Sequence, residues 1–95
     1  MIDKRLLGRW DSIPGTTEEA VTIEFADDGS LTYTIHAAHA DQKIFLRCRT
    51  EDDVIVSDQP SEPREERTQY RFAQDGRLVM TYEGEETIYR RGAKT

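Results

Sequence analysis

The sequence predicts an all-β fold, a small antiparallel up-and-down meander that forms a barrel or a strongly curled sheet. Three observations support this prediction. Apolar and polar residues alternate along most of the chain, one hairpin string occurs twice, and 95 residues suffice for a single domain, residues 1–95. Alternation with a period of two is typical of half-buried strands, because successive side chains point to opposite faces of a sheet.

A seven-residue string occurs twice and marks two hairpins. It reads FADDGSL at residues 25–31 and FAQDGRL at residues 72–78. In the first copy, a three-residue loop at 27–29 places Phe25 opposite Leu31 and brings the apolar residues of both strands onto one face. A two-residue loop would shift one strand by one residue and turn its apolar side chains outward.

Glycine closes both predicted loops. Gly29 and Gly76 occupy the last loop position, where a type I turn is followed by a residue with positive φ. Glycine adopts that conformation without steric cost. The same loop length in the second copy pairs Phe72 with Leu78, so we expect two hairpins of the same design.

The other strands are less regular, and one segment interrupts them. The alternation predicts further strands at 6–13, 43–50, 54–57 and 86–91, with a helical turn at 2–6 before the first. The segment 57–67, SDQPSEPREER, contains two prolines and six charged residues and predicts a surface loop of about ten residues. About eight strands in sequential order are typical of a meander or barrel.

Net charge and cysteine content limit the kinds of partner and the cellular compartment to be expected. The net charge is −6, from 19 acidic and 13 basic residues, so we expect neither nucleic acid nor an anionic membrane as a partner. The single cysteine, Cys48, cannot form an intramolecular disulfide and favours a reducing compartment. No stretch approaches the ~20 apolar residues of a membrane span. We therefore expect a soluble, cytoplasmic protein.

The start of the chain carries a family resemblance. LLGRWDS resembles the Gly-X-Trp opening motif of lipocalins and related calycin barrels, here Gly8 to Trp10. Those families commonly place an arginine late in the last strand, where it packs across the tryptophan and closes the barrel. YRRG offers Arg90 or Arg91 for this role. Together with the meander, these residues make the chain similar to small bacterial lipocalin-like domains.

Tyrosines supply the candidate ligand site. The predicted pairing turns Tyr33, Tyr70 and Tyr82 inward. A buried tyrosine either packs in the core, where its hydroxyl needs a partner, or lines a cavity and offers the hydroxyl to a ligand. Arg64, in the predicted loop at 57–67, is a fourth candidate because that loop could cover the mouth of the barrel.

An aromatic and basic patch supplies a candidate interface. Phe45 and Arg47 alternate with the apolar Ile44 and Leu46 and therefore lie on the outer face, which His36 shares. Interfaces favour aromatic residues and arginine. We expect a homodimer that covers Phe45; the alternative is an ordinary charged exterior with one exposed phenylalanine.

Motifs for catalysis or metal binding are weak. His36 and His39 lie three residues apart, and such residues face opposite sides of a strand. Cys48 alternates with core residues, where a thiol is an inert hydrophobe. The acidic residues lie mostly in turns. We therefore expect no cofactor and no metal, and no catalytic set can be named, although enzymatic activity stays open.

Two functions compete on this basis. The first is a non-catalytic binding module for a small, mostly apolar ligand, with the 57–67 segment as its lid. The second is an interaction domain with a filled core that homodimerises through an outer sheet face or an edge strand. A cavity of several hundred Å³ would favour the first, and a filled core the second.

Overall fold

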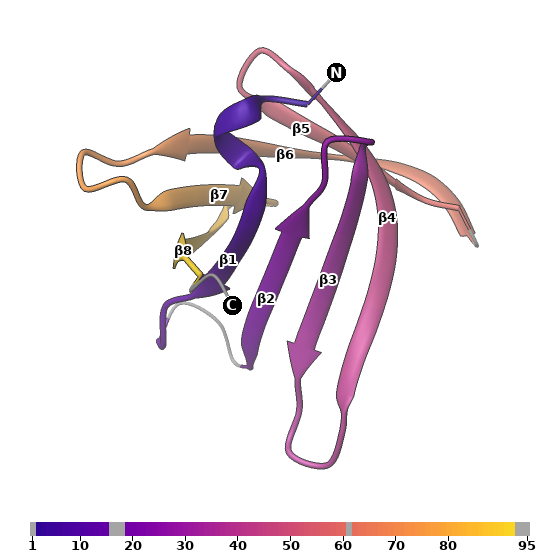
Figure 1. Cartoon of the computed structure of the whole chain (residues 1–95), viewed down its shortest axis with the longest axis vertical. Helices are drawn as coiled ribbons and strands as arrows, with labels where there is room; N and C mark the ends of the chain where they lie inside the picture. Colours follow the sequence, from indigo (N-terminus) through magenta and orange to yellow (C-terminus); the bar gives the residue numbers. More distant parts are fainter. Residues whose placement is uncertain (1, 16–18, 61, 93–95) are drawn as a thin grey trace.

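The computed structural model describes residues 2–15, 19–60 and 62–92. Within them, one short 3-10 helix precedes eight antiparallel strands that pair in sequential order and close into a barrel, with β8 back on β1 (Figure 1). The predicted all-β meander is confirmed. The elements are η1 (Lys4–Leu6), β1 (Gly8–Ser12), β2 (Ala20–Phe25), β3 (Ser30–His36), β4 (Asp41–Glu51), β5 (Val54–Gln59), β6 (Glu62–Phe72), β7 (Leu78–Tyr82) and β8 (Glu85–Arg91).

The two repeated strings form matching hairpins. Phe25 pairs with Leu31 in β2–β3, and Phe72 pairs with Leu78 in β6–β7, as predicted. In each copy the glycine amide donates to the carbonyl of the alanine three residues earlier, at 3.1 and 2.9 Å. The second aspartate of FADDGSL and the aspartate of FAQDGRL each accept the amide two residues ahead, at 2.8 and 3.0 Å. The repeat therefore specifies one turn geometry.

The predicted loop at 57–67 is wrong. β5 continues to Gln59 and β6 starts at Glu62, so a tight turn replaces the long loop. The charged run belongs to an extended β6, in which Arg64 and Glu66 line the interior while Glu65 and Arg67 are exposed. Pairing shifts between Ser57 and Gln59, and the Asp58 carboxylate accepts the Arg64 amide there at 2.8 Å. The Asp58 side chain thus takes the place of a backbone hydrogen-bond partner where the pairing of β5 and β6 is irregular. The segment is a wall of the barrel and not a lid.

One end of the barrel is closed by the N-terminal segment. At this closed end lie η1 and the β2–β3, β4–β5 and β6–β7 turns. Trp10 is only 1% exposed, and its indole Nε1–H donates to the Leu6 carbonyl at 2.8 Å. The Arg91 guanidinium lies 3.9 Å above the Trp10 ring. Of the two arginines offered by the sequence, Arg91 holds this place, and Arg90 is exposed on the outer face.

The motif glycine makes this closure possible. Gly8 has a φ of +108°, and a Cβ at this position would lie 3.1 Å from Nη1 of Arg91. Arg91 also donates to the carbonyls of Leu7, at 2.6 Å, and of Arg5, at 2.9 Å. Because glycine has no side chain, the Arg91 guanidinium can pack against Gly8 and reach the carbonyls of the N-terminal segment.

The opposite end is splayed open. Along β4, residues 41–46 pair with β3, and pairing with β5 starts only at Arg47. Along β6, pairing with β7 is confined to Gln69–Phe72. The β3–β4 and β5–β6 hairpins consequently diverge (Figure 1). This divergence leaves the interior accessible at the end that we call the open end.

Candidate ligand-binding site

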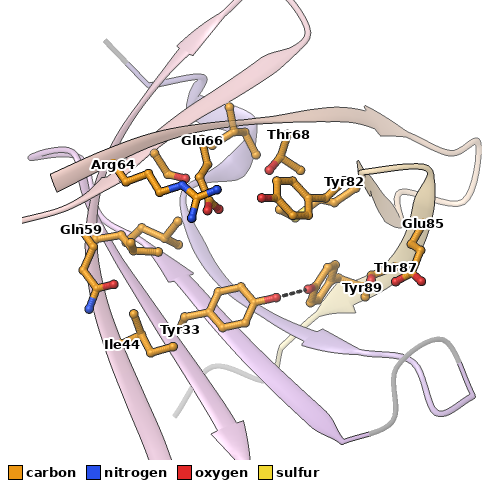
Figure 2. Close-up of a pocket in the computed structure, with 15 residues that line it drawn as sticks. Tyr33, Ile44, Gln59, Arg64, Glu66, Thr68, Tyr82, Glu85, Thr87 and Tyr89 are labelled. Carbon is orange, nitrogen blue, oxygen red and sulfur yellow. Dashed lines mark hydrogen bonds between the residues drawn. The ribbon is translucent and has the colours of Figure 1, made fainter. Parts of the chain in front are cut away.

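A cavity of about 490 Å³ occupies the open half of the barrel (Figure 2). Residues of β3 to β8 form its walls, and they fall into an apolar group and a polar or aromatic group. The apolar lining residues are Leu31, Ile44, Leu46, Ile55 and Met80. The polar and aromatic ones are Tyr33, Ser57, Gln59, Arg64, Glu66, Thr68, Tyr82, Glu85, Thr87 and Tyr89. The size lies within the range of about 300–1,000 Å³ for small-molecule sites.

The deepest polar feature is a pair of tyrosine hydroxyls. The Tyr33 and Tyr89 Oη atoms are 3.1 Å apart, and either can be the donor. The two rings reach toward each other from β3 and β8, which are separated in the sheet by β1 and β2 (Figure 2). Tyr89 is 1% exposed, and burial raises the pKa of its hydroxyl. The Tyr89 hydroxyl therefore stays protonated at neutral pH.

The rim of the cavity is polar and charged. Arg64 and Glu66 come from β6, and Tyr82 and Glu85 come from the β7–β8 hairpin. Tyr82 is 37% exposed, and partial burial followed by the Glu66 carboxylate raises its pKa. In Figure 2 the Arg64, Glu66 and Tyr82 side chains lie along one side of the opening. The rim can therefore donate hydrogen bonds to the outer part of a ligand and also accept them from it.

The structure brings three of the four predicted ligand residues together. Tyr33, Tyr82 and Arg64 line the cavity. Tyr70 also faces inward but lies at the closed end, where its hydroxyl donates to Asp3 Oδ2 at 2.8 Å and lies 3.2 Å from the Asp52 carbonyl. Alternation predicts which face a residue occupies but not its height along the barrel, so Tyr70 could not be separated from the others by pattern.

Sequence reasoning missed Tyr89 as a cavity residue. A signal was present: if Arg91 reaches inward to Trp10, then Tyr89, two residues earlier on the same strand, must also face inward. Glu66 was missed because the predicted loop at 57–67 hid the alternation of β6, and Thr68, just past that loop, was not named as a site residue. The signal for them lay in Tyr70, which is inward on the same strand.

The predicted interface residues share the outer face of β3 and β4. Phe45 is 64% exposed and pairs with Thr32. His36 lies at the open end of the same face, where Nε2 is 2.9 Å from Thr22 Oγ1 and Nδ1 is 3.2 Å from Asp41 Oδ1. Arg47 lies toward the closed end, beyond Phe45.

Cys48 lies outside the cavity. It is half-buried and lines a second hollow of about 400 Å³ next to the N-terminal segment. Burial raises the pKa of the thiol to about 11, so the nucleophilic thiolate is scarce at neutral pH. Among residues 2–15, 19–60 and 62–92, no group of three His, Cys, Asp or Glu side chains is arranged to hold a metal ion.

Two further observations concern the chain as a whole. No helix in the described part of the chain is both long and apolar enough to cross a membrane. No protein-family model, curated protein or solved structure matches the sequence or the fold. The geometry of the barrel is therefore the basis for its function proposed below.

Proposed function

We propose that this chain is a small lipocalin-like binding protein that holds a small, mostly apolar molecule in its open end. One observation carries the proposal: a cavity of about 490 Å³ enters a barrel whose other end is sealed. Five aliphatic or thioether side chains of the wall supply the apolar surface, and burial of that surface drives binding at about 25 cal/mol per Å². The cytoplasmic location expected from the single cysteine stays a prediction.

A fluorescence titration tests this function. N-phenylnaphthylamine is an apolar dye whose emission rises when it leaves water. We expect saturable binding by the wild-type protein with a Kd of the order of micromolar, which corresponds to about 8 kcal/mol. Ile44→Trp, which fills the cavity wall, should weaken binding at least tenfold.

Lys43→Trp is the matched control. It adds an indole to the same strand, but on the exposed outer face. Binding by this variant should equal that of the wild type. Equal loss in both variants, or no binding by the wild-type protein at all, would contradict the proposed function.

A second candidate function rests on Phe45. An exposed phenylalanine beside Arg47 on an outer sheet face fits an interface between two copies of the chain, each covering the other's Phe45. Of the two routes predicted for such a dimer, the outer face is the one to test first, because it carries the exposed Phe45. The edge-strand route stays a prediction, since residues 41–46 of β4 pair only with β3. The core is not filled, since the cavity occupies its open half.

Sedimentation velocity at tens of micromolar tests this association. We expect a dimer for the wild type and a folded monomer for Phe45→Glu. Gln69→Glu, a new carboxylate at an exposed position of β6, should remain dimeric. A wild-type monomer, or a dimer that survives Phe45→Glu, rejects the candidate.

A further inference from the structure

The Tyr33–Tyr89 pair contains one more hydrogen-bond donor than the protein uses. Two hydroxyls carry two hydrogens, and only one of these can lie between the two oxygens. Within the described residues, neither hydroxyl has another hydrogen-bond partner. Whichever tyrosine accepts, its own O–H is left without an acceptor.

The spare hydrogen is available to the cavity. Both residues line it; Tyr89 is 1% exposed, and Tyr33 is half-buried and presents its side of the pair to the cavity. A ligand that covers this donor must supply an acceptor, because a donor buried without one is costly. The donor that bonds this acceptor is also polarised by its partner hydroxyl, because hydrogen-bond chains are cooperative.

The charge around the cavity selects the kind of acceptor. The charged lining residues, Arg64, Glu66 and Glu85, lie at the rim, and together they carry one positive and two negative charges. The lining residues that flank the two tyrosines on their own strands, Leu31 on β3 and Thr87 on β8, are neutral. An anionic oxygen placed there would lose its hydration without gaining a cation, so a neutral oxygen fits better.

We propose that the Tyr33–Tyr89 pair recognises a carbonyl oxygen, and that the ligand is an uncharged, largely apolar molecule carrying a ketone, ester or amide group at its inner end. The apolar body packs on Ile44, Leu46 and Met80, and the outer end meets the polar rim. This inference rests on the proposed binding function and adds the chemical class of the ligand.

Prodan, a naphthalene dye with a propionyl group, is a suitable probe because its emission shifts to the red when its carbonyl accepts a hydrogen bond. Bound to the wild-type protein, Prodan should emit further to the red than it does in an aprotic solvent of low polarity. The double variant Tyr33→Phe/Tyr89→Phe should bind it about five- to tenfold more weakly and abolish the red shift, as expected for one net hydrogen bond.

The single variants give a sharper expectation. Tyr33→Phe leaves the Tyr89 hydroxyl free to donate, and Tyr89→Phe leaves the Tyr33 hydroxyl free. Each single variant should therefore keep the red shift and lose no more than about threefold in affinity, well short of the loss in the double variant. Tyr70→Phe, which removes an inward hydroxyl outside the cavity, is the matched control and should bind Prodan like the wild type.

N-phenylnaphthylamine, which has no carbonyl, separates the two claims. Its affinity should change less than twofold in the double variant. If it does not bind the wild-type protein, the proposed function fails. If it binds while wild-type Prodan shows no red shift, or if the double variant binds Prodan as tightly as the wild type, the function stands and the carbonyl inference is overturned. Circular dichroism checks folding, and the wild-type emission decides the matter if the double variant does not fold.

Discussion

The closed end and the open end of this barrel use similar residues for different purposes. At the closed end, Trp10, Phe72 and Tyr70 pack with ring centroids 6.0 Å apart from one to the next, and the Tyr70 hydroxyl already has an acceptor in the protein. At the open end, Tyr33 and Tyr89 face a cavity and share a single hydrogen bond. The same residue type completes a core at one end and leaves a donor free at the other.

The difference follows from how the strands are paired. The two repeated hairpins both turn at the closed end, where tight loops draw β2–β3 and β6–β7 together. The longer β4 and β6 run past their partners at the open end. Stability should therefore depend mainly on the closed end and binding on the open end, and four measurements can break or sharpen this division.

The largest effect is expected at Trp10. Trp10→Ala should lower the free energy of unfolding by about 3–5 kcal/mol, because it removes a fully buried side chain and leaves a void. Ile44→Ala, at the half-buried cavity wall, should cost about 1 kcal/mol or less. Urea denaturation measures both. Comparable losses would show that the open end carries as much of the stability as the closed end.

Arg91 should come next. Arg91→Met keeps an unbranched side chain but loses the contact with Trp10 and the bonds to two carbonyls, for a cost of about 2 kcal/mol. Arg90→Met, one residue earlier on the exposed outer face, is the control and should change stability by about 0.5 kcal/mol or less. If the two variants unfold at the same urea concentration, Arg91 does not close the barrel.

The two matching turns should differ in their sensitivity. Gly29 and Gly76 have φ values of +90° and +86°, so alanine is strained at both, by about 1 kcal/mol. A Cβ on Gly29 would also lie 3.3 Å from the Cys48 carbonyl, whereas nothing lies within 4 Å of one on Gly76. Gly29→Ala should thus destabilise more than Gly76→Ala. The reverse order in thermal unfolding would contradict the geometry of the β2–β3 turn.

Much of the closed end could be predicted from sequence because its signals are local. The spacing of Phe25, Gly29 and Leu31 sets the register of a hairpin on its own, and the prediction proved correct. The placement of an arginine over Trp10 came from the family resemblance and left two candidates. The structure distinguishes Arg91 from its neighbour, because the Arg91 guanidinium lies over the Trp10 ring and against Gly8.

The open end was harder to predict because it depends on where strands diverge. Two prolines and a run of charge at 57–67 suggested a loop, yet the residues form the extended ends of β5 and β6. Pro60 occupies the turn between these strands, and the Asp58 carboxylate replaces a backbone partner near the register shift. The loop prediction therefore kept Glu66 out of the cavity wall, although it lies four residues before the inward Tyr70 on one strand.

The last predicted effect is a pH dependence at the closed end. Hydrogen bonds from Arg5 and, to a lesser extent, from Tyr70 lower the pKa of Asp3 to about 2, from 3.8. A carboxyl whose pKa is depressed on folding adds stability above its unfolded pKa and loses it as the pH falls through the folded value. Because Arg5 is largely exposed, solvent screening limits this contribution to about 1 kcal/mol.

Asp3→Asn isolates this contribution from the other carboxylates. At pH 6 the wild type should be more stable than Asp3→Asn by about 1 kcal/mol, and the gap should narrow between pH 4 and pH 2 as the wild-type carboxylate is protonated. Asp28 and Glu51, whose pKa values are also lowered, titrate in both proteins and cancel in the difference. Urea midpoints at each pH give the gap. A gap that stays constant down to pH 2 would mean that the Asp3 charge does not help to hold η1 on the barrel, and that the seal at this end is made by packing and neutral hydrogen bonds alone.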